Sequence, residues 1–189
     1  MRKPCIRTAT PDDLGGARAV MLDAVYRDFG TGYVPHWHAD IIDPERFYLA
    51  PPRHTLLVAV DERDGRVAAT AALDARGPAH PPNPRPLAER YPSGETAQLR
   101  RVYVRPEYRR RGLARQLVGE LMEFAAADGD YRSVYLHTDP ASPGAGRDRP
   151  HRKRLSFSFT RRGSRHRNLE VEDPLPAPRT HRKDENETR

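Results

Sequence analysis

The segment from residue 96 to residue 127 constrains the fold more than any other part of the chain. A strand-like run, TAQLRRVYV, leads through RPEYRRRG into a helical pattern whose apolar residues share one face. That face contains Leu113, Leu117, Leu121, Phe124 and Ala125, joined at its edge by Val118 and Met122. A strand connected by a tight basic turn to an amphipathic helix is typical of α/β domains.

The other patterned segments extend this unit to a sheet. Alternating or continuously apolar runs predict strands within residues 5–10, 54–61, 67–73 and 129–138. A helix is expected from Thr10, which suits a helix cap, to about Arg27, and a short helix after Pro35. An Asp-Gly turn joins the second and third strands as a hairpin, and the proline-rich residues 74–94 are predicted to form a long loop. This order of elements predicts a mixed α/β sheet.

Composition divides the chain in two. Its 189 residues suit one domain, but hydrophobic residues make up only 37%, and most of the net charge of +7 lies after residue 138. We therefore expect a domain at residues 1–139 and a basic, low-order tail at residues 140–189. Within the tail, residues 155–159 alternate and predict one edge strand, and the chain from residue 160 is predicted to be disordered.

Cysteine usage and hydropathy limit the location of the protein. A single cysteine, Cys5, excludes an internal disulfide. No apolar run is long enough to span a bilayer, and the first residues do not resemble a secretory signal. The sequence thus favours a cytoplasmic protein without a membrane segment.

The basic turn has the features of a phosphate site. A helix start leaves backbone N–H groups without partners and carries partial positive charge, so it favours an anion. Gly112 lets the backbone approach a ligand closely, Ala114 is small, and Arg109, Arg110, Arg111 and Arg115 supply cations. Neither a P-loop nor a dinucleotide-binding glycine motif after a strand occurs in the sequence. The alternative interpretation is a solvated basic helix start.

The run VYVRPEYRRRGLARQLV resembles the acetyl-CoA-binding segment of the GNAT acyltransferases. Their pattern, Arg/Gln-x-x-Gly-x-Gly/Ala, falls on residues 109–114, and the order of elements over residues 6–139 also matches. The resemblance implies an α/β GNAT-like fold, with a mixed, mostly antiparallel sheet flanked by helices and with C-terminal elements degenerate or missing. It also implies an N-acetyltransferase that moves acetyl directly from acetyl-CoA to the amine of a small molecule or protein. The alternative is a non-catalytic, degraded acyltransferase or a basic-tail binding module.

The resemblance further implies where acetyl-CoA binds. The pantetheine arm would pair with the strand before the turn, and the pyrophosphate would lie on the amides from residue 110 to residue 115. The implied cofactor-binding residues are Val102, Tyr103, Val104, Arg109, Arg110, Arg111, Gly112, Leu113, Ala114 and Arg115. The acceptor amine would enter between this strand and the next.

The sequence departs from the family pattern in its catalytic residues. Alternate positions of the cofactor strand, Gln98, Arg100 and Val102, offer no carboxylate as a base. Glu95, just before the strand, is a weak candidate for the base, and a solvated loop residue is the simpler interpretation. The family's tyrosine acid has no counterpart after Tyr135. The catalytic base and acid therefore stay unassigned.

The region that should supply a further helix and a closing hairpin changes abruptly near residue 144. Arg, Pro, His and Ser replace the apolar pattern there, and no amphipathic helix fits. We hypothesise a shifted reading frame or a divergent replacement. Sequencing the coding DNA tests this, because the hypothesis fails if no other frame continues a helix and two strands.

The histidines, the single tryptophan and the basic tail offer further candidates for function. The run HWHAD spaces His36, His38 and Asp40 by two, but without a third convincing partner it does not favour a metal site. Trp37 and His137 fall where the family forms its acceptor pocket and gap, although packing is the simpler interpretation for both. The basic tail resembles no named nucleic-acid module, so nucleic acid is not favoured as a partner.

Overall fold

The computed structural model describes residues 3–81, 83–136, 154–158 and 169–172. The strands are β1 (Cys5–Thr8), β2 (Thr55–Asp61), β3 (Arg66–Asp74), β4 (Thr96–Val104), β5 (Ser133–Leu136), β6 (Arg154–Ser158) and β7 (Leu169–Glu172). The α-helices are α1 (Leu14–Asp23), α2 (Pro35–Ile42), α3 (Arg85–Arg90) and α4 (Leu113–Asp128). Short 3-10 or π turns are η1 (Pro11–Asp13), η2 (Ala24–Asp28), η3 (Glu45–Leu49) and η4 (Pro106–Tyr108).

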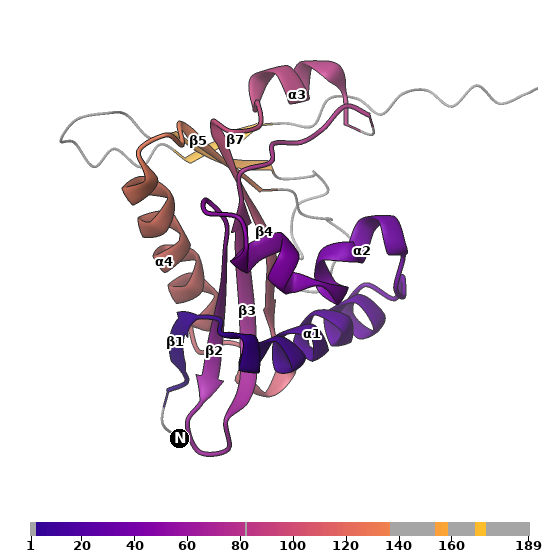
Figure 1. Ribbon diagram of the computed structural model, residues 1–189, viewed down its shortest axis with the longest axis vertical. Helices are drawn as coiled ribbons and strands as arrows, with labels where there is room; N and C mark the ends of the chain where they lie inside the picture. Colours follow the sequence, from indigo (N-terminus) through magenta and orange to yellow (C-terminus); the bar gives the residue numbers. More distant parts are fainter. Residues whose placement is uncertain (1–2, 82, 137–153, 159–168, 173–189) are drawn as a thin grey trace, which may run out of the picture.

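The strands form one sheet in the order β1 to β7, in which only β4 and β5 are parallel. Helix α4 covers one face of this sheet, and α1 with α2 covers the other (Figure 1). The fold is therefore an α/β arrangement with a mixed, mostly antiparallel sheet, as the sequence predicts.

The β2–β3 hairpin lies between β1 and β4 in the sheet. Its strands pair from Thr55 with Leu73 to Asp61 with Arg66, with a register shift between Ala59 and Val60, and both are buried on both faces. The turn closes with Gly65 at φ +71° and its amide on the carbonyl of Asp61. The hairpin predicted from the Asp-Gly sequence is confirmed.

Two strands come from the part of the chain predicted to be of low order. β6 pairs antiparallel with β5, and β7 pairs antiparallel with β6. The strand predicted at residues 155–159 therefore exists but is not at the sheet edge, and the prediction of disorder from residue 160 is corrected at Leu169–Glu172. The helix sought before the closing hairpin falls within residues 137–153, outside the described residues.

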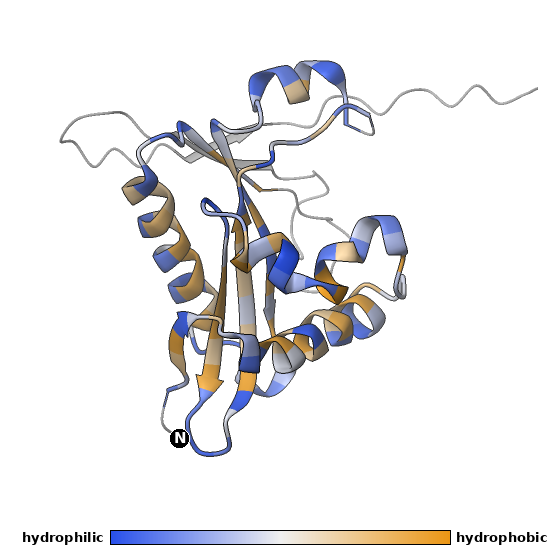
Figure 2. Ribbon diagram, viewed as in Figure 1, coloured by the Kyte–Doolittle hydropathy of each residue, from blue (hydrophilic) through white to orange (hydrophobic). Residues whose placement is uncertain are grey.

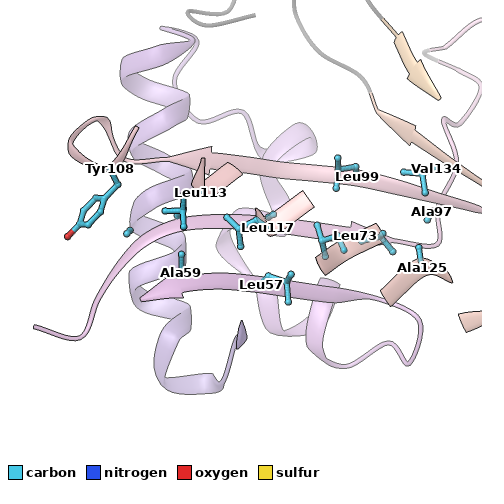
Figure 3. Packing of buried hydrophobic residues seen from close by; sticks show 14 of the residues in the cluster. Leu57, Ala59, Leu73, Ala97, Leu99, Tyr108, Leu113, Leu117, Ala125 and Val134 are labelled. Atoms are coloured by element: carbon cyan, nitrogen blue, oxygen red, sulfur yellow. The ribbon is translucent and has the colours of Figure 1, made fainter. Parts of the chain in front are cut away.

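The face under α4 has a continuous apolar core. Leu113, Leu117, Leu121 and Ala125 of the helix are buried, and they pack on the central strands. Figure 3 shows side chains of this packing, with Leu113, Leu117 and Ala125 of α4 near Leu57, Leu73 and Leu99 of β2, β3 and β4. The apolar face predicted for this helix is thus the one that it buries.

The opposite face is covered by α1 and the turns that follow it. Val20, Met21 and Val25 pack on Leu56 and Val58 of β2. In Figure 2 the apolar residues of α1 and α4 lie on the sides that meet the sheet. The helix predicted from residue 10 to about residue 27 is confirmed, although its two ends are the turns η1 and η2.

At the start of this helix, Asp13 joins the first strand to the first helix. Its carboxylate accepts hydrogen bonds from the amide and hydroxyl of Thr10, both at 2.8 Å. It also forms a two-pronged ion pair with Arg7 at 2.5 and 2.8 Å. The Arg7 hydrogen bonds hold the pKa of Asp13 down at about 2.

The far end of α4 is fastened by Arg53, from the segment before β2. The Arg53 guanidinium donates to both oxygens of Asp128, at 2.7 to 3.0 Å, and to the carbonyl of Gly94 at 2.8 Å. The same guanidinium lies over the Tyr131 ring, 4.3 Å from its centre. These contacts fix the C-terminal end of α4 against the hairpin.

The segment predicted as a long proline-rich loop contains a short helix. Leu87 and Tyr91, within and just after α3, pack with Tyr135 of β5. This small cluster needs long-range contacts, which explains why local sequence did not reveal the helix.

None of the helices in the described part of the chain is long and apolar enough to cross a bilayer.

Candidate functional site

The strands β4 and β5 pair over only part of β4. Their register runs from Thr96 with Ser133 to Leu99 with Leu136, and β4 then continues to Val104. Within the described residues, the second half of β4 is bonded to β3 alone. The other edge of this half therefore presents backbone donors and acceptors beside a gap in the sheet.

A β-bulge separates the two halves of β4. The β3–β4 register shifts between Thr70 and Ala72, and opposite this shift Arg101 has a φ of +53°, rare for a residue with a side chain. The Thr70 hydroxyl donates to the Arg101 carbonyl at 2.8 Å. Because the bulge adds one residue, Leu99 and Val102 both pack on the α4 side.

The bulge changes which β4 side chains share a face. Arg100 lies opposite Ala72, whose side chain belongs to the core under α1. Val102 therefore lies on the face opposite to Arg100, which regular alternation did not predict. No glycine marks this bulge in the sequence, so the role of Arg101 was missed.

The hydrogen-bonding direction along the end of β4 follows from one contact. The amide of Arg105 donates to the Ala68 carbonyl at 2.9 Å, so residues 103 and 105 direct their backbone groups toward β3. Those of Val102 and Val104 consequently face the open edge. The Val104 carbonyl accepts a bond from Arg109 Nε at 2.8 Å, which leaves both amides and the Val102 carbonyl at this edge.

The turn between β4 and α4 presents further amides. Arg110 and Gly112 have φ values of +61° and +75°, and α4 begins at Leu113. The first hydrogen bond of the helix runs from the amide of Gln116 to the Gly112 carbonyl at 3.1 Å. The amides of residues 113–115 thus have no acceptor inside the helix and face the turn, where the helix dipole is positive.

Tyr108 fixes the turn to the hairpin. Its ring is buried at the end of the α4 core, as Figure 3 shows, and its hydroxyl donates to Asp61 at 2.9 Å. Asp61 also binds Arg63, and those hydrogen bonds hold the Asp61 pKa well below its usual range. The RPEYR sequence therefore supplies an anchor as well as charge.

The arginines of the turn are not equivalent. Arg109 forms an ion pair with Asp28 of η2 in addition to its bond with Val104. Arg110, Arg111 and Arg115 are exposed, and the Arg111 guanidinium lies 5.8 Å from the centre of the Tyr108 ring. The sequence predicted four mobile cations, but Arg109 serves as a tie between the turn, β4 and η2. A shallow pocket lined by β4, η2 and the turn lies beside this tie.

The HWHAD sequence lies on α2, where the predicted short helix is confirmed. Asp40 is buried and accepts hydrogen bonds from Arg101 at 2.6 and 2.7 Å and from the Tyr48 hydroxyl. Burial opposes its charge, but the Arg101 bonds prevail and lower the Asp40 pKa. Arg101 also donates to the Trp37 carbonyl at 2.7 Å, so it links the bulge to α2.

The histidines of α2 differ in environment. His36 is exposed, whereas His38 is buried and its Nδ1 accepts the Val34 amide at 2.9 Å. Burial, followed by the nearby Arg101 charge, lowers the His38 pKa. No group of three metal-ligating side chains occurs in the part of the chain that the structure describes.

The remaining sequence candidates lie apart from the bulge or beyond the described residues. Glu95 precedes β4 and is half exposed beside Arg132, and the strand rise places it ~20 Å from Val102. That separation argues against Glu95 as a base at the gap. Trp37 is 58% exposed on α2, and His137 lies outside the described residues.

Sequence and structure comparisons agree on one family. Residues 22–147 match the profile of the Acetyltransferase (GNAT) family. No curated protein gives a significant sequence match.

The fold is similar to several solved acetyltransferases. An acetyltransferase from Streptococcus agalactiae 2603 is 17% identical, with 94% of each chain covered and a TM-score of 0.55. A GNAT family acetyltransferase from Staphylococcus aureus Mu50 is 14% identical, covers 72% of this chain and 74% of its own, and has a TM-score of 0.56. A Brucella melitensis GNAT family acetyltransferase, solved in complex with acetyl-CoA, is 21% identical, with 92% and 96% covered and a TM-score of 0.53.

Proposed function

This chain belongs to the GNAT acetyltransferase family, and we propose that it is an enzyme that transfers acetyl from acetyl-CoA directly to a primary amine. The observation that carries the proposal is the turn before α4. There, a left-handed Gly112 opens a helix whose first amides lack acceptors, beside a strand edge that is not covered by β5.

The residues of the site fit the two polar parts of acetyl-CoA. The edge of Val102 and Val104 offers two amides and one carbonyl, which match the amides of a pantetheine arm. The amides of residues 113–115, with the exposed Arg110 and Arg115, suit a pyrophosphate. In this proposal Arg109 positions the turn, because its guanidinium is already held by Val104 and Asp28.

The chemistry requires little beyond positioning and proton transfer. When bound, acetyl-CoA supplies a thioester whose C–S bond breaks as the new C–N bond forms. The amine must lose a proton, and the leaving thiolate must gain one. No carboxylate of β4 faces the gap, so we leave the base and acid unassigned; Arg101 and Asp40 bind each other and hold the bulge in shape.

The test is calorimetric titration of the full chain with acetyl-CoA, comparing Gly112→Asp with Gly119→Asp. The variants introduce the same side chain, at the N-cap of α4 and within α4, but Gly119 is exposed with no atom within 4 Å of an added Cβ. At Gly112 the new carboxylate enters the anion site on a backbone with φ +75°. We expect Gly112→Asp to weaken binding at least about tenfold and Gly119→Asp to leave it unchanged.

Three outcomes separate the interpretations. Loss of affinity in Gly112→Asp alone supports the cofactor site, and an acceptor screen then tests turnover. Binding without turnover on any amine would favour a degraded, non-catalytic acyltransferase. Equal affinity in both variants, or no binding by the folded wild-type chain, would refute the proposed site.

A further inference from the structure

The bulge of β4 lies in a cluster of charged side chains on the α1 face of the sheet. This bulge cluster consists of Asp40, Asp74, Arg76, Arg100 and Arg101. It contains three guanidinium groups and two carboxylates. Its charge is therefore unbalanced by one positive unit.

Each carboxylate of the bulge cluster already has its own arginine. Asp40 accepts two short bonds from Arg101, at 2.6 and 2.7 Å. Asp74 is fully buried and accepts the Arg76 amide at 2.9 Å and the Arg76 guanidinium at 2.5 Å. Both ion pairs are closed in the folded protein.

Arg100 has the longest ion pair of the bulge cluster. Among the described residues it forms an ion pair with Asp74, in which Arg100 Nη1 lies 3.7 Å from Asp74 Oδ2. This distance is beyond that of a hydrogen bond. Its side chain is 29% exposed, so the guanidinium is partly desolvated yet reachable. Such a group binds a carboxylate well, because the planar guanidinium matches its two oxygens.

The position of Arg100 connects it to the proposed reaction. It follows Leu99, the last β4 residue that pairs with β5, and it precedes the edge of Val102 and Val104. Its side chain lies on the α1 face, opposite Ala72. Arg100 therefore stands at the start of the gap, on the side of α2 and away from α4.

We infer that Arg100 binds a carboxylate of the acceptor, so that the acceptor is a small amine of the amino-acid class. The inference rests on the proposed function and adds the substrate class to it. A neutral amine would leave the extra positive charge of the bulge cluster without a partner, whereas an amino acid brings the missing carboxylate. Asp40 and Asp74 make their short bonds with Arg101 and Arg76, so neither forms a hydrogen bond with Arg100.

The turnover experiment uses matched acceptors and matched variants. The twenty L-amino acids and their primary amides are supplied with acetyl-CoA, and thiol release is followed. We expect kcat/KM for the best acid to exceed that of its amide at least about tenfold, mainly through KM. Arg100→Gln should reduce this preference to about twofold or less, and Arg100→Lys should restore part of it. Arg85→Gln, an exposed arginine on α3, is the control for loss of one charge.

A binding measurement makes the inference independent of turnover. Trp37 is the single tryptophan of the chain, and its carbonyl contacts Arg101 of the same cluster. Its fluorescence is titrated with each acid and each amide in the absence of acetyl-CoA. A response to acids that is lost in Arg100→Gln supports the carboxylate site even if acetyl transfer fails.

Other results would overturn the inference. If the amides are acetylated as efficiently as the acids, Arg100 does not bind a carboxylate of the acceptor. An acid preference that is unchanged in Arg100→Gln would show the same. Acetylation of carboxylate-free polyamines alone would do the same. Absent transfer together with absent acid binding would also overturn it, whereas lost acetyl-CoA affinity with intact acid binding would refute only the proposed function.

Discussion

Arg101 is held in the β4 bulge by the hydrogen bonds of its side chain and of its backbone carbonyl. Its left-handed backbone is unfavourable for a residue with a Cβ, and its guanidinium is nearly buried, with 9% exposed. The Arg101 guanidinium donates to Asp40 and to the Trp37 carbonyl, and the Arg101 carbonyl accepts a bond from the Thr70 hydroxyl. A glycine would relieve the backbone but would lose the link to α2.

We expect Arg101→Ala to lower the free energy of unfolding by ~3–5 kcal/mol, because it leaves Asp40 buried without its cation. Arg66→Ala, which removes a half-exposed partner of Glu107, should cost no more than ~1 kcal/mol. Urea denaturation checks both values. The double variant Arg101→Met with Asp40→Asn should recover part of the loss, and no recovery would mean that the pair is not the cause.

At the scale of elements, the two ends of α4 have different tasks. The N-terminal end leaves its amides open at the turn, whereas the C-terminal end is held by Arg53 through Asp128. The apolar face between them packs on the hairpin. A helix fastened at one end and along its length can keep its other end free for a ligand.

Asp128→Asn should therefore lower stability without changing acetyl-CoA affinity. The variant weakens the two-pronged bond to Arg53, which we expect to cost ~1–2 kcal/mol. Asp130→Asn, two residues further and exposed, is the matched control. Thermal denaturation and calorimetry are measured on the same samples; a fall in affinity with Asp128→Asn would contradict the division of tasks.

At the scale of the whole molecule, local pattern predicted the elements and their order. The hairpin, the strand at residues 96–104 and the helix after Gly112 were all readable, because alternation, an Asp-Gly turn and a seven-residue apolar face are local signals. The GNAT-like fold followed from their order and from the RRRGLA turn. The limits of the domain and the cofactor residues stay predictions.

The features that were missed depend on contacts distant in sequence. Arg101 and Asp40 are 61 residues apart, so nothing near either residue reveals their pairing. The bulge carries no glycine, and β7 lacks a pattern strong enough to stand out from its basic surroundings. Tertiary pairing, rather than propensity, produces these features.

Acid should destabilise the molecule through its paired carboxylates. The folded pKa of Asp13 is about 2, below its usual value of 3.8, so its stabilisation is complete above about pH 4 and is lost as the pH falls toward 2. The full pKa difference corresponds to ~2 kcal/mol, and we expect about half because Arg7 is 41% exposed. The difference in unfolding free energy between pH 7 and pH 3 should be smaller in Asp13→Asn than in the wild type. Asp12→Asn, in the same turn, should keep the wild-type slope.

The β4 bulge also determines how the strand would respond to a change in its length. If β4 kept all its residues but lost the bulge, plain alternation would turn Val102 and Val104 toward α1 and Tyr103 toward α4. Deleting residue 101, by contrast, would remove the extra residue together with the bulge and would leave each later side chain on its present face. The length of this stretch is therefore constrained more tightly than its composition, because one residue added between the bulge and Val102 would turn the edge residues to the other face of the sheet.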